Sequence, residues 1–411
     1  MTKSKNKTKR LILGILSFVG IILISYFLII YLSVPYYTYN TPEPFHGEIL
    51  HNPYQGMNPD HWRRYNFHSH SNRYGLFANG RNNTAEEVDS IYAVMGYDHV
   101  SISDYNSINR YGSDRADYIP VYEHGYGLFR RTHQLGIGAQ KVRKIDYPFS
   151  QNLDIKQHNI NKMKEGSALV ALAHPSYTRG YKVSDMKYLS NYDFVEVLNP
   201  YGRSFEHWDM ALSNGHRVYI LADDDSHNAF NPNEIGRHFN MINSPDLAPD
   251  NILSSLKNGM SYGVDFNIYY NEPFERKIEG LKGLPHLTRA ELIADTFFVE
   301  TSQKMRKIDF IGQGGQVLKT MENVSSAYYV IQPNDTYVRT EIRLPNFTYF
   351  YLNHVTRHET HSIDKQRLDV VNPVTTWFYR LIYITTIALL IRMLIKRRKE
   401  KHDETNPQQN Q

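Results

Sequence analysis

The chain carries imidazole and carboxylate side chains in positions where they could hold a divalent metal ion. His68 and His70 form a His-x-His pair in the stretch YNFHSH. In an extended strand alternate side chains share a face, so both imidazoles can reach one ion. A single pair of this kind is weak evidence, because most histidines are solvated or packed. The metal hypothesis therefore depends on whether similar residues later in the chain converge on this pair.

Similar residues do recur, each beside a short apolar run: Asp104, Glu123, His133, His174, Asp225 and His227. Imidazoles combined with a few carboxylates suit a borderline divalent ion such as manganese, iron or zinc, and a carboxylate can bridge two ions. The chain has no cysteine, which excludes thiolate ligands and disulfides. Each residue alone has an ordinary reading as a strand cap or a solvated turn. Their repetition after successive strands favours a shared metal site.

Alternating strands and helices are expected to position these residues. The stretch NTAEEVDSIYAVM predicts a helix over 83–95, with Thr84 as its cap, and a second helix is expected over 157–165. Repeated units of this kind indicate an α/β fold with a parallel sheet, open or closed into a barrel, whose polar residues gather at the strand ends. Apolar runs predict strands over 97–103, 119–122, 168–173, 194–198 and 216–221.

Length and charge narrow the function. A chain of 411 residues fits one large domain with a smaller companion. The formal net charge is only +4, and the basic residues gather at the two termini, so no nucleic acid is expected as a partner. The lack of cysteine fits an extracytoplasmic domain without proving one.

Both ends of the chain are directed to a membrane. A basic tail over 1–10 precedes an apolar run over 11–34, which is long enough to cross a bilayer and has no small-residue cleavage site after it. A second apolar run over 376–395 precedes a basic and polar tail over 396–411. The positive flanks predict cytoplasmic termini, a cell-membrane location and an extracytoplasmic region between the two spans. The alternative for the second run is an amphipathic helix on the membrane surface.

The amino-acid composition of the region between the two spans changes along its length. Residues 35–64 are rich in Pro, Asn and Tyr and are expected to be a linker. Residues 65–264 hold the alternating elements and all of the candidate ligands. Short β-rich runs such as TFFVETS and KIDFIG predict a small sandwich-like domain over 265–365.

The order of the motifs resembles the PHP (polymerase and histidinol phosphatase) family. The series is H-x-H, SDYN after a strand, a glutamate, THQLGIG, AHP and D-x-H, from about Asn66 to Val264. The tail, with KIDFIGQGGQVL, is similar to the CehA/McbA-type branch. The resemblance implies a distorted (β/α)7 barrel. It also implies one metal on His68, His70, Glu123 and Asp225, and a second metal that Glu123 shares with His133 and His174.

Two departures from the family pattern fall on its third metal site. Gly75 stands where the family has an acidic or histidine ligand, and Tyr105 stands where it has histidine. A phenol with a pKa near ~10 is a poor substitute for imidazole. The resemblance therefore implies two divalent ions, with His227 left as a weaker ligand or a general acid. A decayed, inactive domain is the alternative.

The activity expected from the resemblance is hydrolysis of a phosphate monoester or diester at the membrane, on an anionic substrate of the cell envelope. His227 or Tyr105 could protonate the leaving oxygen, Arg179 could bind the phosphate, and Asp104 could orient a ligand. The alternatives are a carboxyl or carbamate ester hydrolase of CehA/McbA type and a non-catalytic sensor or binding module.

Overall fold

The structure is a computed structural model that describes residues 2–73, 82–127, 130–149, 151–360 and 369–405. The chain divides into two compact units. One unit joins the two chain ends, residues 1–39 and 369–411, and the other contains residues 40–368. The expected departure at Gly75 lies outside the described residues.

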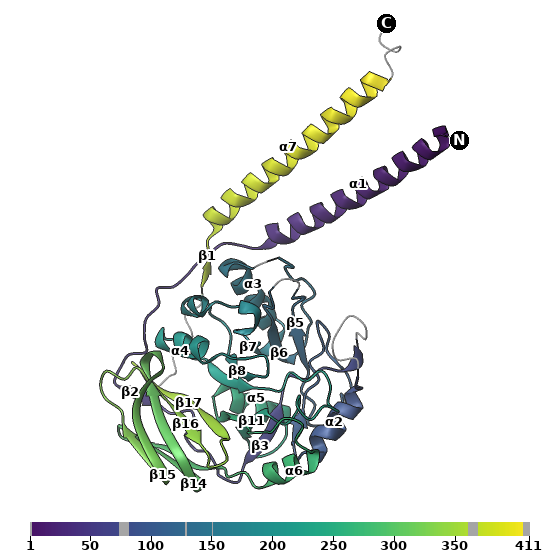
Figure 1. The fold of residues 1–411 in the computed structure, drawn as a ribbon. Helices are drawn as coiled ribbons and strands as arrows, with labels where there is room; N and C mark the ends of the chain where they lie inside the picture. Colours follow the sequence, from purple (N-terminus) through teal and green to yellow (C-terminus); the bar gives the residue numbers. More distant parts are fainter. Residues whose placement is uncertain (1, 74–81, 128–129, 150, 361–368, 406–411) are drawn as a thin grey trace. The chain divides into compact units, whose positions relative to one another are not determined.

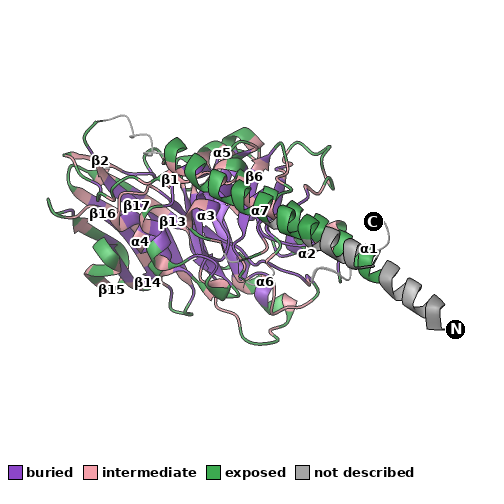
Figure 2. Cartoon of the chain, turned by 90° about the horizontal axis from the view of Figure 1, so that it is seen from above, coloured by how far each residue is buried: buried purple, intermediate pink, exposed green. Residues whose placement is uncertain are grey.

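The end unit contains two long helices, α1 (Thr2–Ser33) and α7 (Pro373–Thr405). In the described parts of the chain, Ile12–Ser33 and Pro373–Lys396 are long and apolar enough to cross a membrane. Figure 2 shows α7 exposed along most of its described length, as an apolar helix without a protein partner would be. By length and composition these helices match the spans expected over 11–34 and 376–395.

A short ladder joins the inner ends of α1 and α7 within this unit. β1 (Tyr37–Thr38) pairs antiparallel with β18 (Val370–Val371). The Arg380 guanidinium donates from Nε to the carbonyl of Leu32 at 3.0 Å, in the last turn of α1. A cation at this position satisfies a carbonyl without a helical partner and complements the helix dipole. The ladder thus connects the C-terminal end of α1 to the N-terminal end of α7.

The main unit contains a mixed sheet that supplies most of the candidate ligands. Within the described residues this sheet has six strands in the order β10-β8-β7-β6-β5, with β9 paired to β8. Its strands are β5 (Val121–His124), β6 (Gln134–Ala139), β7 (Ser167–Leu172), β8 (Phe194–Asn199), β9 (Gly202–Arg203) and β10 (Tyr219–Ala222).

The expectation of an all-parallel sheet was wrong for part of this sheet. β7, β8 and β10 are parallel, but β6 runs antiparallel to both β5 and β7. Parallel neighbours need a crossover, which is usually a helix, and the described residues between β5 and β6 contain no helix. The coarse α/β class is confirmed, while a regular succession of seven βα units is not seen.

A second sheet spans the rest of the main unit. Its order among the described residues is β13-β14-β16-β17-β12-β11-β3-β4, with β15 on β14 and β2 on β17. These strands are β2 (Ile49–His51), β3 (Trp62–Asn66), β4 (His99–Val100), β11 (His238–Asn243), β12 (Ser261–Asp265), β13 (Leu287–Ile293), β14 (Thr296–Gly312), β15 (Gln316–Val330), β16 (Tyr337–Arg343) and β17 (Tyr349–His358).

This second sheet changes the expected division at residue 265. The sequence predicted a separate sandwich over 265–365, but β17 pairs directly with β12, and β12 continues through β11 to β3. Figure 1 shows the long strands β14 and β15 at one side of the same unit that holds β5 to β8. The β-rich segment therefore extends the sheet of the preceding region and shares its core.

Single bridges link the two sheets near the candidate ligands. Ser69 pairs with Ser226, so the chain after β3 lies beside the chain after β10. Tyr105 pairs with Glu123, so the chain after β4 lies beside β5. Both links are reinforced by backbone hydrogen bonds, for example from His70 N to Ser226 O at 2.8 Å. The strand ends that carry the candidate residues are thereby brought to one place.

Helices cover the outer faces of the sheets. α2 begins where the sequence predicted, because Thr84 accepts from Glu87 N and the Glu87 carboxylate accepts from Thr84 N in a capping box. The side chain of Asn152 starts α3 in the same way, one turn earlier than expected. The helices of the main unit are α2 (Ala85–Val94), α3 (Leu153–Lys164), α4 (Phe205–Ser213), α5 (Pro249–Lys257) and α6 (Phe274–Lys282).

Candidate metal centre

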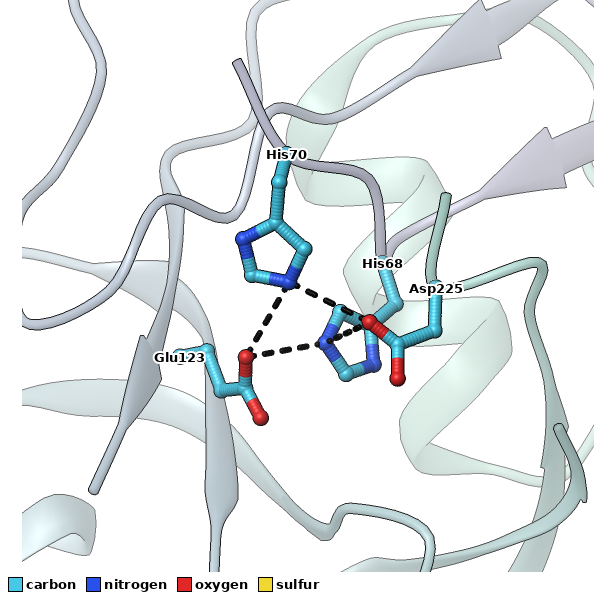
Figure 3. Close-up of side chains that lie close together, drawn as sticks. All are labelled: His68, His70, Glu123 and Asp225. Carbon is cyan, nitrogen blue, oxygen red and sulfur yellow. Dashed lines mark hydrogen bonds and ion pairs between the residues drawn. The ribbon is translucent and has the colours of Figure 1, made fainter. Parts of the chain in front are cut away.

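Four side chains from three separate parts of the chain face one another in the buried interior (Figure 3). His68 Nε2 lies 3.2 Å from both Glu123 Oε2 and Asp225 Oδ1. His70 Nε2 lies 3.1 Å from Glu123 Oε2 and 3.2 Å from Asp225 Oδ1. Among the described residues, these four form one of two groups whose ligand atoms all lie within 4.8 Å of one another.

The second group shares Glu123 with the first. Its other members are His133 and His174, and all three side chains are buried. Glu123 Oε1 lies 2.5 Å from His133 Nδ1 and 3.1 Å from His174 Nε2. The structure therefore brings together the six residues that the resemblance implied as ligands of two metals, in the same two groups.

The mixed direction of the sheet explains how these residues meet. Glu123 lies in β5, and His133 immediately precedes β6. Because β6 is antiparallel to β5 and β7, its first residue lies beside their last residues, and the backbone N–H of Ala173 donates to the carbonyl of His133. His174 follows β7 and Asp225 follows β10, at the same edge of the sheet.

Two of these residues have backbone conformations that side chains rarely adopt. His174 has φ of 30° and Asp225 has φ of 44°. A residue other than glycine in this region costs about 1–3 kcal/mol and is retained where the surrounding structure requires it, often at functional sites. Here the sharp turn after each strand directs the side chain back toward Glu123.

Carboxylates control the charge of the imidazoles. Burial disfavours a charged imidazole, but Asp225 and Glu123 raise the pKa of His70 to about 9, and the pKa of His68 and of His174 is also raised. Burial likewise opposes ionisation of Glu123, yet His133 and His68 hold the pKa of its carboxyl well below the usual range. In the metal-free chain, protons on the imidazoles therefore compensate the buried carboxylates.

The donor atoms fit a pair of metal ions. His68 Nε2 and Glu123 Oε2 are buried and make no hydrogen bond although they lie 3.2 Å apart, and His133 Nε2 also lacks a partner among the described residues. Buried polar atoms without partners are costly, unless a ligand satisfies them. Nitrogen and carboxylate oxygen atoms in this mixture suit manganese, iron or zinc.

Glu196 is a further member of the centre that sequence reasoning missed. Its Oε1 lies 2.9 Å from His68 Nδ1, and its Oε2 accepts from the backbone N–H of His174 at 2.6 Å and from Asn199 Nδ2 at 3.1 Å. A carboxylate on the far nitrogen of a ligating histidine fixes its tautomer and increases its basicity. The available signal was a charged residue inside the buried strand FVEVLN.

His227 and Tyr105 flank the first group. The His227 ring stacks on His70 with centroids 4.4 Å apart, and its Nε2 lies 3.5 Å from Asp225 Oδ1. Burial, together with the charge of His70, lowers the pKa of His227 to about 3, so this imidazole is neutral. The ring of Tyr105 lies 4.5 Å from that of His70 and 6.2 Å from that of His227, and burial raises the pKa of its phenol well above the usual value.

Asp104 lies behind the centre. Its carboxylate accepts from the backbone N–H and the hydroxyl of Ser71 and from Asn109 Nδ2, at 2.8 to 2.9 Å. These bonds fix the backbone that follows His70. Asp104 belongs to neither of the two ligand groups among the described residues, and the orienting role expected for it stays a prediction.

Arg179 is not brought to the centre. Its side chain is exposed, and the contacts described for residue 179 are local, from its backbone N–H to Ser176 O at 3.2 Å. Arg131 lies closer to the candidate ligands, with its guanidinium 5.3 Å from the centroid of the Tyr177 ring, which itself packs against His174. The phosphate-binding role expected for Arg179 stays a prediction, and Arg131 is a second arginine near the centre that the sequence analysis did not consider.

Comparison with solved structures gave one match. It is described as a two-domain protein containing a predicted PHP-like metal-dependent phosphoesterase from Bacteroides vulgatus. The identity is 11%, the TM-score is 0.38, and the match covers 75% of this chain and 96% of the other. No family model and no curated protein matches the sequence.

Proposed function

We propose that this chain is a membrane-anchored, extracytoplasmic, metal-dependent phosphoesterase. The observation that carries the proposal is the position of Glu123, whose carboxylate belongs to both ligand groups. Oε1 faces His133 and His174, whereas Oε2 faces His68 and His70. A carboxylate that offers one oxygen to each of two ions holds them close together, which is the arrangement of two-metal hydrolases that act on phosphate esters.

The charge of the centre supports an anionic substrate. When bound, two divalent ions supply a water of lowered pKa as the nucleophile and neutralise charge on the phosphoryl oxygens. Glu123, Asp225 and Glu196 offset part of that positive charge, and burial near Glu196 raises the pKa of Asp223 so that this neighbour stays neutral. The remaining positive surplus is smaller than two ligating carboxylates alone would leave, but it still favours an anionic phosphate ester, either a monoester or a diester.

Tyr105 is the residue best placed to protonate the leaving oxygen. Its ring lies 4.5 Å from that of His70 and 5.8 Å from that of His133, so it borders both ligand groups. Its raised pKa keeps the hydroxyl protonated and available as a donor. His227, the other candidate, is neutral beside His70, and nearby metal cations would disfavour its protonation further.

The end unit supports an orientation with both termini in the cytoplasm. α1 ends and α7 begins at the β1–β18 ladder, so both helices leave the ladder from the same side. The basic segment KSKNKTKR precedes the first apolar stretch and KRRKEK follows the second, so both lie at the helix ends away from the ladder. Ends that are rich in Lys and Arg stay in the cytoplasm, which leaves the main unit on the other side of the membrane.

The test uses the full chain in detergent, loaded with manganese, and measures bound metal together with hydrolysis of bis-p-nitrophenyl phosphate. We expect two ions per chain and turnover that is lost in Glu123→Ala but kept in Glu165→Ala, which changes an exposed glutamate. Turnover of an aryl carboxylate ester without turnover of the phosphodiester would instead indicate an esterase of CehA/McbA type. Neither metal nor turnover would leave a binding module.

A further inference from the structure

Two tyrosines form a stack at the edge of the metal centre. The rings of Tyr177 and Tyr201 lie 4.9 Å apart with an interplanar angle of 25°. Tyr177 packs edge-on against His174 with centroids 5.6 Å apart, and Tyr201 lies 6.4 Å from His227. The stack therefore contacts a residue of the second ligand group at one end and a neighbour of the first group at the other.

The stack is partly open to solvent, unlike the ligands beside it. The side chain of Tyr201 is 42% exposed, whereas the exposed fractions of His174 and His227 are 2% and 6%. A tyrosine that serves only the core would be covered. Tyr201 instead offers apolar ring surface at the boundary between the buried centre and the solvent, where part of a substrate outside the reacting group would lie.

Close backbone packing fixes Tyr177 and Tyr201 relative to each other. A Cβ atom on Gly202 would lie 2.5 Å from Ser176 Oγ, so a larger residue after Tyr201 would displace the Ser176 hydroxyl. Ser176 N also donates to Ser204 Oγ at 3.2 Å. The surface is thus formed before any ligand binds, which lowers the entropic cost of binding.

Hydrogen bonds connect Tyr201 to the metal centre. The backbone N–H of Tyr201 donates to Asn199 Oδ1 at 2.9 Å, and Asn199 Nδ2 donates to Asp225 Oδ2 at 3.2 Å and to Glu196 Oε2 at 3.1 Å. The Asn199 amide thereby bonds to the Tyr201 backbone, to the candidate ligand Asp225 and to the carboxylate behind His68. This connection fixes the backbone that carries the Tyr201 ring relative to the centre.

Arg131 adds a positive charge to the same place. Its guanidinium lies 5.3 Å from the centroid of the Tyr177 ring. Its backbone is fixed, because Arg131 N donates to Thr178 Oγ1 at 2.8 Å and a Cβ on Gly180 would lie 2.0 Å from Arg131 O. A guanidinium beside a metal pair suits a phosphoryl oxygen that the ions leave uncovered.

We propose that the Tyr177–Tyr201 stack and Arg131 form a substrate subsite that selects anionic phosphate esters whose alcohol carries a flat ring. The phosphoryl group is shared between the metal centre and Arg131, and the ring contacts the exposed surface of Tyr201. The inference rests on the proposed phosphoesterase function. It adds the class of substrate, namely esters of ring-bearing alcohols in preference to esters of short aliphatic alcohols.

Two phosphonates test the subsite without hydrolysis. Phenylphosphonate carries a ring and methylphosphonate does not, and the C–P bond of each resists ester cleavage. Calorimetric titration of the manganese-loaded full chain should give tighter binding of phenylphosphonate. Tyr201→Ala should weaken phenylphosphonate binding about tenfold and leave methylphosphonate within about twofold, whereas Tyr201→Phe should retain the preference. Arg131→Gln should weaken both ligands, by roughly tenfold.

Controls separate the subsite from the fold and from the function. Tyr270→Ala removes a tyrosine that is 86% exposed in the loop after β12 and should bind both ligands as the wild type does. Metal content and melting temperature of each variant report whether the fold persists. Equal affinity for the two phosphonates, or a preference unchanged in Tyr201→Ala, overturns the subsite and leaves the phosphoesterase intact. Binding of neither phosphonate, together with no phosphodiester turnover, overturns both.

Discussion

Glu196 lies directly behind His68, with 2.9 Å between its Oε1 and the imidazole Nδ1. Both side chains are fully buried, and the other nitrogen of His68 faces Glu123 and Asp225. The relationship fixes which nitrogen of His68 is free to bind a metal. It also holds the loop after β7, because the second oxygen of Glu196 accepts from His174 N.

We therefore expect Glu196→Gln to weaken metal binding although Glu196 is not itself a ligand in either group. The amide keeps the shape but loses the charge that makes His68 more basic, and changes behind a ligand of this kind cost roughly 10- to 100-fold in metal affinity. Competition with a fluorescent chelator measures the loss. Glu206→Gln, in the exposed first turn of α4, is the matched control. Equal affinity in the two variants would contradict the role of Glu196.

The shared carboxylate predicts a difference in metal stoichiometry. Glu123→Gln should reduce binding at both sites, because each group loses an anionic oxygen. His133→Ala should reduce binding only at the second site, since His133 belongs to that group alone. Elemental analysis after gel filtration distinguishes two ions, one ion and none. Loss of both ions in His133→Ala, with the fold intact, would show that the two sites are not separable as proposed.

The raised pKa values of His68, His70 and His174 predict opposite pH dependences with and without metal. In the metal-free chain the folded state holds protons that the unfolded state releases above pH ~6.5, so stability is lost as the pH rises toward the folded pKa. For His70 the folded pKa is about 9. The pH range that isolates the histidines ends near pH 8. Burial lowers the pKa of Lys277 to about 8, so above that pH this lysine makes the stability rise with pH, against the trend of the histidines.

Excess metal should reverse this trend, because only deprotonated imidazole binds metal and affinity therefore rises with pH. The measurement is the urea concentration at the midpoint of unfolding, monitored by tryptophan fluorescence at pH 6.5 and pH 8, with either chelator or manganese present. The midpoint should fall with pH in chelator and rise with pH in manganese. The same sign under both conditions would mean that these histidines do not exchange protons for metal.

The absence of cysteine makes the membrane topology directly testable. Single substitutions Ser4→Cys, Tyr270→Cys and Thr405→Cys place one thiol in each tail and one in the main unit. An impermeant maleimide applied to intact cells should label the Tyr270→Cys chain alone, and lysis should expose the other two. Labelling of Thr405→Cys in intact cells would show that α7 does not return to the cytoplasm, contrary to the orientation expected from the basic flanks.

The six candidate ligands were predicted from the sequence because each stands near a strand end in an apolar context. His174 after the apolar run 168–173 and Asp225 after the run that ends at Ala222 are examples. The residues that support the candidate ligands were missed. The charge of Glu196 inside a buried strand was a signal that the sequence analysis did not use. Arg131 is held near the centre by contacts of its backbone with Thr178 and Gly180, which its position in the sequence does not predict.

The direction of β6 and the extent of the second sheet also escaped sequence reasoning. A βα pattern predicts parallel strands, but β6 is antiparallel to β5, and the described residues of the link between them contain no helix. The β-rich texture after residue 265 was recognised, yet local propensity does not say which strand pairs with which. The pairing of β17 with β12, for example between Leu352 and Tyr262, joins segments far apart in sequence.

Because the β-rich segment shares a sheet with the rest of the main unit, we expect residues 40–368 to unfold cooperatively. Removal of one buried ion pair tests this expectation. Arg339 in β16 binds Asp209 in α4 through two hydrogen bonds of 2.8 Å, and Tyr337 donates to the same carboxylate at 3.0 Å. Removing one member leaves a buried charge without its partner, which costs about 3–5 kcal/mol. We expect Asp209→Ala to lower the urea midpoint of the whole main unit in a single transition, with metal release at the same midpoint. Two separate transitions, with metal retained through the first, would instead indicate that the β-rich segment is an independent domain.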